Sequence, residues 1–363
     1  MSIKKGISKI ILIAGVFPLF SFAFSVAQKY PSYTYVFSEF GVDQSYVYDE
    51  DFERFVLMHE SQIMSFYQCS LKKGKNFLPM MRGYLLEDGL SDLFVYLSMV
   101  ESGFSPSAAS HKNAVGLWQF IPATAKHYNL EVCQRFDERC DPISSTNAAI
   151  AYLQKLHDRF GKWYLAALAY NCGEGRLAKA IEKAGSDALP ILLDEKEKYL
   201  PPETREYIKK ILLAAMIGEG LALEFSSTNG GVLEVEVEGG AKLSELAKLL
   251  EMKPKELLGL NPQFKNETIP SDRFSYKVMI PEEKMILFYL RYELPEKKNP
   301  IKPFMVSHYV ALGETLEDIA ANYETTAEEI KIVNHLSEEY LSVDQFLVIP
   351  VNHKVFVSCS QKK

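Results

Sequence analysis

The stretch Glu101-Ser102-Gly103-Phe104-Ser105-Pro106, with Gly116-Leu117-Trp118-Gln119 shortly after it, decides how this 363-residue chain folds. Leu93 and Leu97 precede Glu101 at helical spacing, so its carboxylate lies on the apolar face of the same helix. Gly103 and Pro106 are residues that end helices, which places the acid in the last turn. The helix dipole and burial both disfavour a negative charge there, and we expect a raised pKa for Glu101.

A carboxyl group with a raised pKa suits general acid catalysis near neutral pH. The alternative is a glutamate at a helix end that faces solvent or pairs with a base, as most glutamates do. Helical spacing does not separate these two interpretations.

Three motifs occur in order along this region. They are Glu101–Pro106 followed by Ser110, then Gly116–Ala125, and then Ala169–Arg176, which contains Tyr170-Asn171-x-Gly173. Together they resemble the soluble-lytic-transglycosylase domain over residues 78–222. The resemblance implies a lysozyme-like, mainly α-helical domain that cuts the glycan strands of peptidoglycan as a carbon–oxygen lyase, without a cofactor.

The resemblance also implies roles for single residues. Glu101 would protonate the oxygen between N-acetylmuramic acid and N-acetylglucosamine and then accept a proton from the muramic C6 hydroxyl, which leaves a 1,6-anhydro sugar. Ser110 and Gln119 match positions that contact the N-acetyl and neighbouring groups of the substrate. Tyr170 matches a tyrosine close to the catalytic carboxylate, and Asn171 belongs to the same motif. Trp118 is interpreted as a hydrophobic wall that could stack on a sugar.

Three other interpretations of the function remain open. A muramidase of the goose-lysozyme kind has the same fold but hydrolyses, with Asp137 or Asp141 activating water. A catalytically inactive domain with sugar-binding modules would be a peptidoglycan-binding scaffold. Cys172 is a weaker candidate nucleophile, because the motifs contain no histidine to activate it.

Beyond Gly231 the pattern changes to an internal repeat of strand, two helices and strand. An offset of 73 residues aligns Leu243 with Leu316 and Asn261 with Asn334. The predicted modules, residues 231–288 and 306–352, are separated by a linker at 289–305. They resemble LysM modules, which bind glycans containing N-acetylglucosamine, and the first is degenerate. The expected fold class is thus mainly α, followed by two small α+β modules, a layout that resembles the membrane-bound lytic murein transglycosylase D family.

The N-terminus has the pattern of an export signal. Three lysines precede an apolar run from Ile10 to Phe24, and small residues follow at 25–27. We expect residues 1–27 to be a signal peptide and the protein to act in the periplasm or cell envelope; the alternative is an uncleaved membrane anchor. Residues 28–77 are predicted to be a lead-in with one helix near Asp51–Tyr67, and residues 353–363 a tail. Without the three lysines the formal charge falls from −7 to −10, which argues against nucleic acid as a partner.

The cysteines suggest one structural bond. Of the five, Cys133 and Cys140 flank a polar loop and are the best disulfide pair in an exported protein. Because there is no CxxC or HExxH pattern and the histidines are scattered, we expect no metal site.

Overall fold

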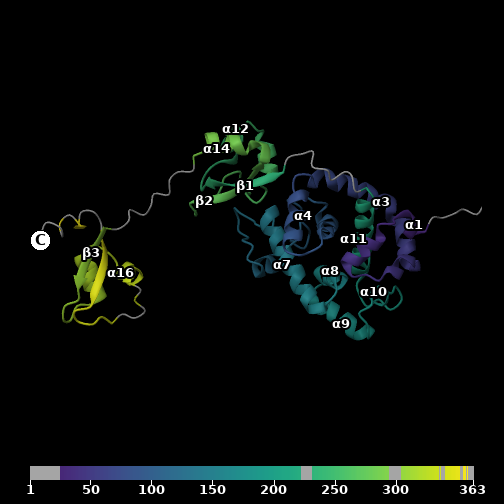
Figure 1. Cartoon of the computed structure of the whole chain (residues 1–363), viewed down its shortest axis with the longest axis horizontal. Helices are drawn as coiled ribbons and strands as arrows, with labels where there is room; N and C mark the ends of the chain where they lie inside the picture. The colour runs from purple at the N-terminus through teal and green to yellow at the C-terminus, as the bar shows by residue number, and fades with distance from the viewer. Residues whose placement is uncertain are drawn as a thin grey trace, which may run out of the picture. The chain divides into compact units, whose positions relative to one another are not determined.

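The computed structural model describes residues 25–221, 231–293, 304–334, 336, 340–351, 355–356 and 358. The chain divides into two compact units, Met1–Tyr292 and Glu293–Lys363. The predicted fold class is confirmed: a helical domain is followed by two modules, each with a two-stranded antiparallel sheet (Figure 1). The predicted export signal falls mostly on residues 1–24, outside the described residues.

The segment predicted as a lead-in is an integral part of the helical domain. It forms α1 (Val26–Lys29), α2 (Tyr33–Phe40), the 3-10 helix η1 (Gln44–Tyr48) and α3 (Glu50–Gly74). Val36, Phe37 and Phe52 are fully buried in the same core as the helices that follow. Val26 is buried in that core as well, so the boundary predicted after Ala27 falls inside a folded helix.

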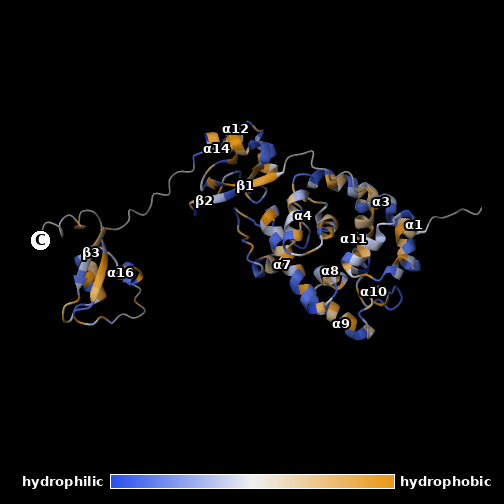
Figure 2. Ribbon diagram, in the orientation of Figure 1, coloured by the Kyte–Doolittle hydropathy of each residue, from blue (hydrophilic) through white to orange (hydrophobic). Residues whose placement is uncertain are grey.

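The rest of the helical domain includes two helices, α8 (Trp163–Cys172) and α11 (Pro202–Gly220), whose residues are mostly buried. Its other elements are α4 (Leu78–Glu87), η2 (Asp92–Phe94), α5 (Val95–Ser102), α6 (Pro122–His127), α7 (Pro142–Phe160), α9 (Glu174–Ala184) and α10 (Leu189–Leu192). The almost wholly apolar α8 is buried between α7 and α11, because a helix that is hydrophobic all round is stable only when it is covered on all sides. In contrast, α9 carries hydrophilic and hydrophobic residues on different faces (Figure 2) and buries only Leu177 and Ala180.

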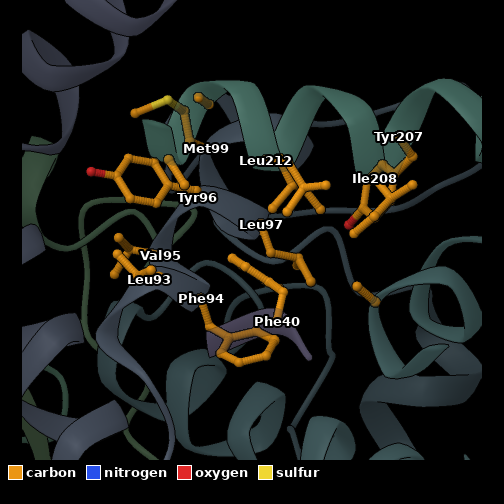
Figure 3. Packing of buried hydrophobic residues seen from close by; sticks show 14 of the residues in the cluster. Phe40, Leu93, Phe94, Val95, Tyr96, Leu97, Met99, Tyr207, Ile208 and Leu212 are labelled. Carbon is orange, nitrogen blue, oxygen red and sulfur yellow. The ribbon is translucent and has the colours of Figure 1, made fainter. Parts of the chain in front are cut away.

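Packing of α11 against α5 fixes the position of Glu101. Ile208 and Leu212 of α11 face Leu97 of α5, and Phe94 and Phe40 complete this part of the core (Figure 3). All five side chains are fully buried. The end of α5 is therefore held against the first half of α11.

The first module pairs β1 (Val232–Glu238) with β2 (Ser275–Pro281), in the register Val235 opposite Val278. Between the strands lie α12 (Leu243–Leu249) and α13 (Pro254–Leu260), and after them come η3 (Glu282–Lys284) and α14 (Met285–Arg291). The second module has β3 (Phe304–Tyr309), α15 (Leu316–Asn322), α16 (Ala327–Asn334) and β4 (Phe346–Val351). Because α14 reaches Arg291 and β3 begins at Phe304, both ends of the predicted linker at 289–305 are structured.

Two equivalent asparagines confirm the internal repeat. The Asn261 side chain donates to the carbonyl oxygens of Leu257 and Met279 and accepts from the Met279 N–H at 2.7 Å. Asn334 makes the same three bonds with Ile330 and Val348. In each module the asparagine ties the second helix to the closing strand, so its repetition is structural and does not by itself indicate sugar binding.

Candidate active site

A cavity of about 690 Å³ lies beside the end of α5. It is lined by all five residues that the sequence motifs singled out: Glu101, Ser110, Gln119, Tyr170 and Asn171. These residues come from α5, the loop after it, and the end of α8. The fold thus brings together three segments that are separated in the chain.

Glu101 stands in the last turn of α5, which ends at Gly103 in the left-handed conformation with φ of 59°. The Tyr207 hydroxyl donates a hydrogen bond to Glu101 Oε1 at 2.6 Å. Burial raises the pKa of Glu101 to about 7, the hydrogen bond from Tyr207 acts in the opposite direction, and the charge of Glu203 adds to the rise. The expected upward shift is therefore present, and burial is its main cause.

Tyr207 is a site residue that the sequence motifs missed. It lies on α11, 106 residues beyond Glu101 in the chain. Tyr170, the tyrosine expected beside the carboxylate, donates instead to the Trp118 carbonyl oxygen at 2.7 Å. Burial first, and then the nearby charge of Glu101, raise the pKa of both Tyr170 and Tyr207 well above the usual value, so both tyrosines remain neutral donors.

Three polar side chains present hydrogen-bonding groups to the cavity. Gln119 has a φ of 50°, and its Nε2 donates to the Gly116 carbonyl oxygen at 2.9 Å, which leaves Oε1 as an acceptor. Asn171 Oδ1 accepts from Thr204 Oγ1 at 2.8 Å, which leaves the amide N–H groups as donors. Ser110 Oγ accepts the backbone N–H of Ala114 at 3.1 Å, so this residue both shapes its loop and lines the cavity.

Trp118 is not a sugar-stacking residue. Its side chain is fully buried, and its Nε1 donates to Thr146 Oγ1 at 3.0 Å. Cys172 lines the cavity, but burial raises the pKa of its thiol to about 11. A protonated thiol is a poor nucleophile, which argues against the cysteine mechanism.

The two aspartates that a hydrolytic mechanism would use form other contacts outside the cavity. Asp137 forms ion pairs with Arg139 and Lys265, and Asp141 caps the N-terminus of α7; neither lines the cavity. The second carboxylate that does line it is Glu203, whose side chain is 74% exposed.

The predicted disulfide is absent. Cys133 is an exposed free thiol and Cys140 a buried one, because the first lies out on the loop while the second lies just before α7. Within the described ranges, no group of three or more His, Cys, Asp or Glu side chains is arranged to hold a metal ion. In the same ranges no helix has the length and apolar character needed to cross a bilayer.

Comparison with known families identifies the parts of the chain. Residues 87–189 match the transglycosylase SLT domain, residues 232–297 the LysM-like domain of lytic transglycosylase MltD, and residues 308–350 the LysM domain. The chain therefore contains a transglycosylase SLT domain followed by two LysM-type modules.

Individual proteins are similar to parts of the chain. The chain is 29% identical over 271 residues to membrane-bound lytic murein transglycosylase D of Escherichia coli K12, covering 70% of this chain and 59% of that protein. It is 44% identical over 101 residues to a putative tributyltin chloride resistance protein of Alteromonas sp., covering 28% of this chain and 49% of that protein. The chain thus spans about three fifths of the E. coli protein. The solved lytic transglycosylase Slt of Pseudomonas aeruginosa aligns with 41% of this chain and 24% of its own, at 24% identity and a TM-score of 0.34.

Proposed function

We propose that the cavity binds a peptidoglycan glycan strand and that Glu101 cleaves the β-1,4 bond between N-acetylmuramic acid and N-acetylglucosamine without water. The observation that carries this proposal is a carboxyl group with a pKa of about 7, bonded to Tyr207, in a cavity that also holds Gln119 and Asn171. The match of residues 87–189 to the transglycosylase SLT domain supports it.

The first step needs an acid. With a pKa of about 7, a large fraction of Glu101 is protonated at neutral pH and able to donate to the glycosidic oxygen. As the bond from that oxygen to C1 breaks, the proton stays on the leaving sugar. The new carboxylate keeps the hydrogen bond from Tyr207, which favours its charged form.

The second step needs a base. The carboxylate of Glu101 accepts the proton of the muramic C6 hydroxyl while the C6 oxygen bonds to C1. This closes a 1,6-anhydro ring and restores the acid, so no water is consumed. The attacking hydroxyl belongs to the sugar itself, and its effective concentration exceeds that of a loosely held water.

The other cavity residues fit a substrate with N-acetyl groups. Gln119 Oε1 suits an amide N–H, and the Asn171 amide suits a carbonyl or hydroxyl oxygen. An N-acetyl oxygen of the substrate stabilises the positive charge at C1, which is the task of the second carboxylate in ordinary glycosidases.

Hydrolysis is the second candidate because Glu203 lines the cavity. An exposed carboxylate there could activate water and give reducing ends. Its side chain is 74% exposed and lies 3.8 Å from Lys112 Nζ, whereas residues 87–189 match the transglycosylase SLT domain. We therefore favour transglycosylation.

Mass spectrometry of the fragments released from purified sacculi tests both candidates. The full chain should release 1,6-anhydro ends, Glu101→Gln should release almost none, and Glu203→Gln should keep the anhydro products. Reducing ends that disappear in Glu203→Gln would mean hydrolysis. Unchanged release by Glu101→Gln would leave a peptidoglycan-binding scaffold as the remaining interpretation.

We further propose that the second module, residues 306–352, holds the enzyme on the glycan in the cell envelope. Its match to the LysM domain supports this, and so do Leu312 and Tyr340, which are 88% and 90% exposed and offer apolar surface to sugar rings. Tyr340→Ala in the full chain should sediment less with sacculi. Equal sedimentation of the variant and the wild type would remove this surface from the proposal.

A further inference from the structure

The loop at residues 130–141 of the helical domain is built into the first LysM-like module. Phe136 belongs to the buried core of that module, where its ring packs on Phe264 at 5.3 Å and on Tyr276 at 5.2 Å between centroids. The Asp137 N–H donates to the Gln263 carbonyl oxygen at 3.0 Å, beside this aromatic cluster. Module and loop therefore share one core and a backbone hydrogen bond.

A cluster of three charged side chains, Lys265, Asp137 and Arg139, continues from this junction. Lys265 Nζ, from the module, donates to Asp137 Oδ2 at 3.0 Å. Asp137 also accepts from Arg139 Nε and Nη2, both at 2.9 Å. Asp137 is 1% exposed and Arg139 6% exposed, so these two charges are removed from water and depend on their partners. The Lys265 side chain is 40% exposed and reaches Asp137 from the protein surface.

Arg139 in turn holds the loop that forms one wall of the cavity. Its Nη1 donates to the carbonyl oxygens of Asn113, at 2.8 Å, and Phe120, at 3.1 Å. The Arg139 carbonyl oxygen lies so close to Gly116 that a Cβ there would stand 1.7 Å from it. Side chain and backbone of Arg139 thus fix the segment that carries Gln119.

We infer that the first LysM-like module is a positioning part of the active site, with Lys265 acting through Asp137 and Arg139 on the cavity loop at residues 110–120. The inference rests on the proposed function only in so far as this loop binds substrate. A guanidinium is held in one orientation by the carboxylate it pairs with. Removing Lys265 takes away one of the donors that hold Asp137, and the two loop carbonyls then lose a fixed partner.

The test compares three variants of the full chain. Lys265→Met removes the ammonium group and Lys265→Arg keeps a donor. Lys253→Met is the control, because the ion pair of Lys253 is with Glu256 of the same module, at 3.8 Å. Hydrogen exchange is measured for amides of the cavity loop, which include the Val115 N–H bonded to the Phe120 carbonyl oxygen at 3.1 Å. KM and kcat are measured on isolated glycan strands.

Lys265→Met should speed exchange in residues 110–120 and raise KM, each by between about twofold and thirtyfold, the range of coupling through such networks. The fall in kcat should be smaller. Lys265→Arg should restore most of both quantities, and Lys253→Met should match the wild type.

The inference is overturned if Lys265→Met leaves exchange and KM at wild-type values. It also fails if exchange rises evenly over residues 78–221, since that means general loosening of the domain. If the wild type releases no product while exchange responds as expected, the proposed function falls and the coupling between module and loop stands.

Discussion

Replacing Glu101 with glutamine should make the protein more stable as well as inactive. Burial raises the pKa of Glu101 from its ordinary value of 4.5 to about 7. The folded protein therefore binds this proton more tightly than the unfolded chain, and stability falls as pH rises from 4.5 through 7. A tenfold change in proton affinity corresponds to about 1.4 kcal/mol, so the charged carboxylate costs about 3 kcal/mol above neutral pH.

Glutamine has nearly the same shape, stays neutral, and can accept the hydrogen bond from Tyr207 through its amide oxygen. We therefore expect the stability advantage of Glu101→Gln over the wild type to grow by about 3 kcal/mol between pH 4.5 and pH 8. Urea unfolding of both proteins at the two pH values measures this difference.

Glu203→Gln is the matched control. It is the same substitution in the same cavity, but the Glu203 side chain is 74% exposed and stays in water when the chain folds. Its stability relative to the wild type should not show this growth with pH. If the advantage of Glu101→Gln is the same at both pH values, burial does not destabilise the carboxylate, and the basis for an acid at neutral pH is lost.

Further predictions concern the site and its supports. Activity on sacculi should fall as pH rises through about 7, because the protonated form of Glu101 is needed. Tyr207→Phe should move this fall to higher pH, since the lost hydrogen bond favoured the charged form of Glu101. A pH–rate profile of both proteins measures the two effects. Gly116→Ala should destabilise the helical domain by about 3 kcal/mol or more, because φ is +88° and the new Cβ would stand 1.7 Å from the Arg139 carbonyl oxygen. Thermal unfolding measures this change. A midpoint temperature equal to that of the wild type would contradict the close approach. Asn261→Ala should destabilise the first module by about 2–4 kcal/mol, because buried backbone groups of Leu257 and Met279 lose their hydrogen-bond partner. Urea unfolding followed by hydrogen exchange of the amides in that module measures the change. Amide protection equal to that of the wild type would contradict the prediction.

Local signals in the sequence mark the start and the buried character of several elements. The two prolines at 201–202 mark the start of α11, and the apolar run from Trp163 gives the buried α8. The repeat was predictable because its buried positions recur at a constant offset, and Leu243 and Leu316 are both in module cores. Such patterns depend on neighbours within a few turns, which the sequence lists directly.

Two predictions were wrong for the same reason. Residues 28–77 were predicted to be a lead-in with one helix, but a local pattern does not say which core a helix face covers, and the helices of this segment complete the helical domain. Cys133 and Cys140 are close in the chain, yet one is exposed and the other buried. Sequence proximity does not set the direction of two side chains on an irregular loop.

By itself the sequence determined that Glu101 lies on an apolar helical face and in a last turn, because helical spacing and the stop at Gly103 are local properties. Only the tertiary structure decided which hydroxyl bonds to this acid, since Tyr207 is 106 residues away and meets it through the packing of α11 on α5. The same holds for the link from Lys265 to the cavity loop, which crosses from the module into the helical domain. The spacing of residues along one helix predicts which side chains share a face of that helix. Which element packs against that face depends on the tertiary structure.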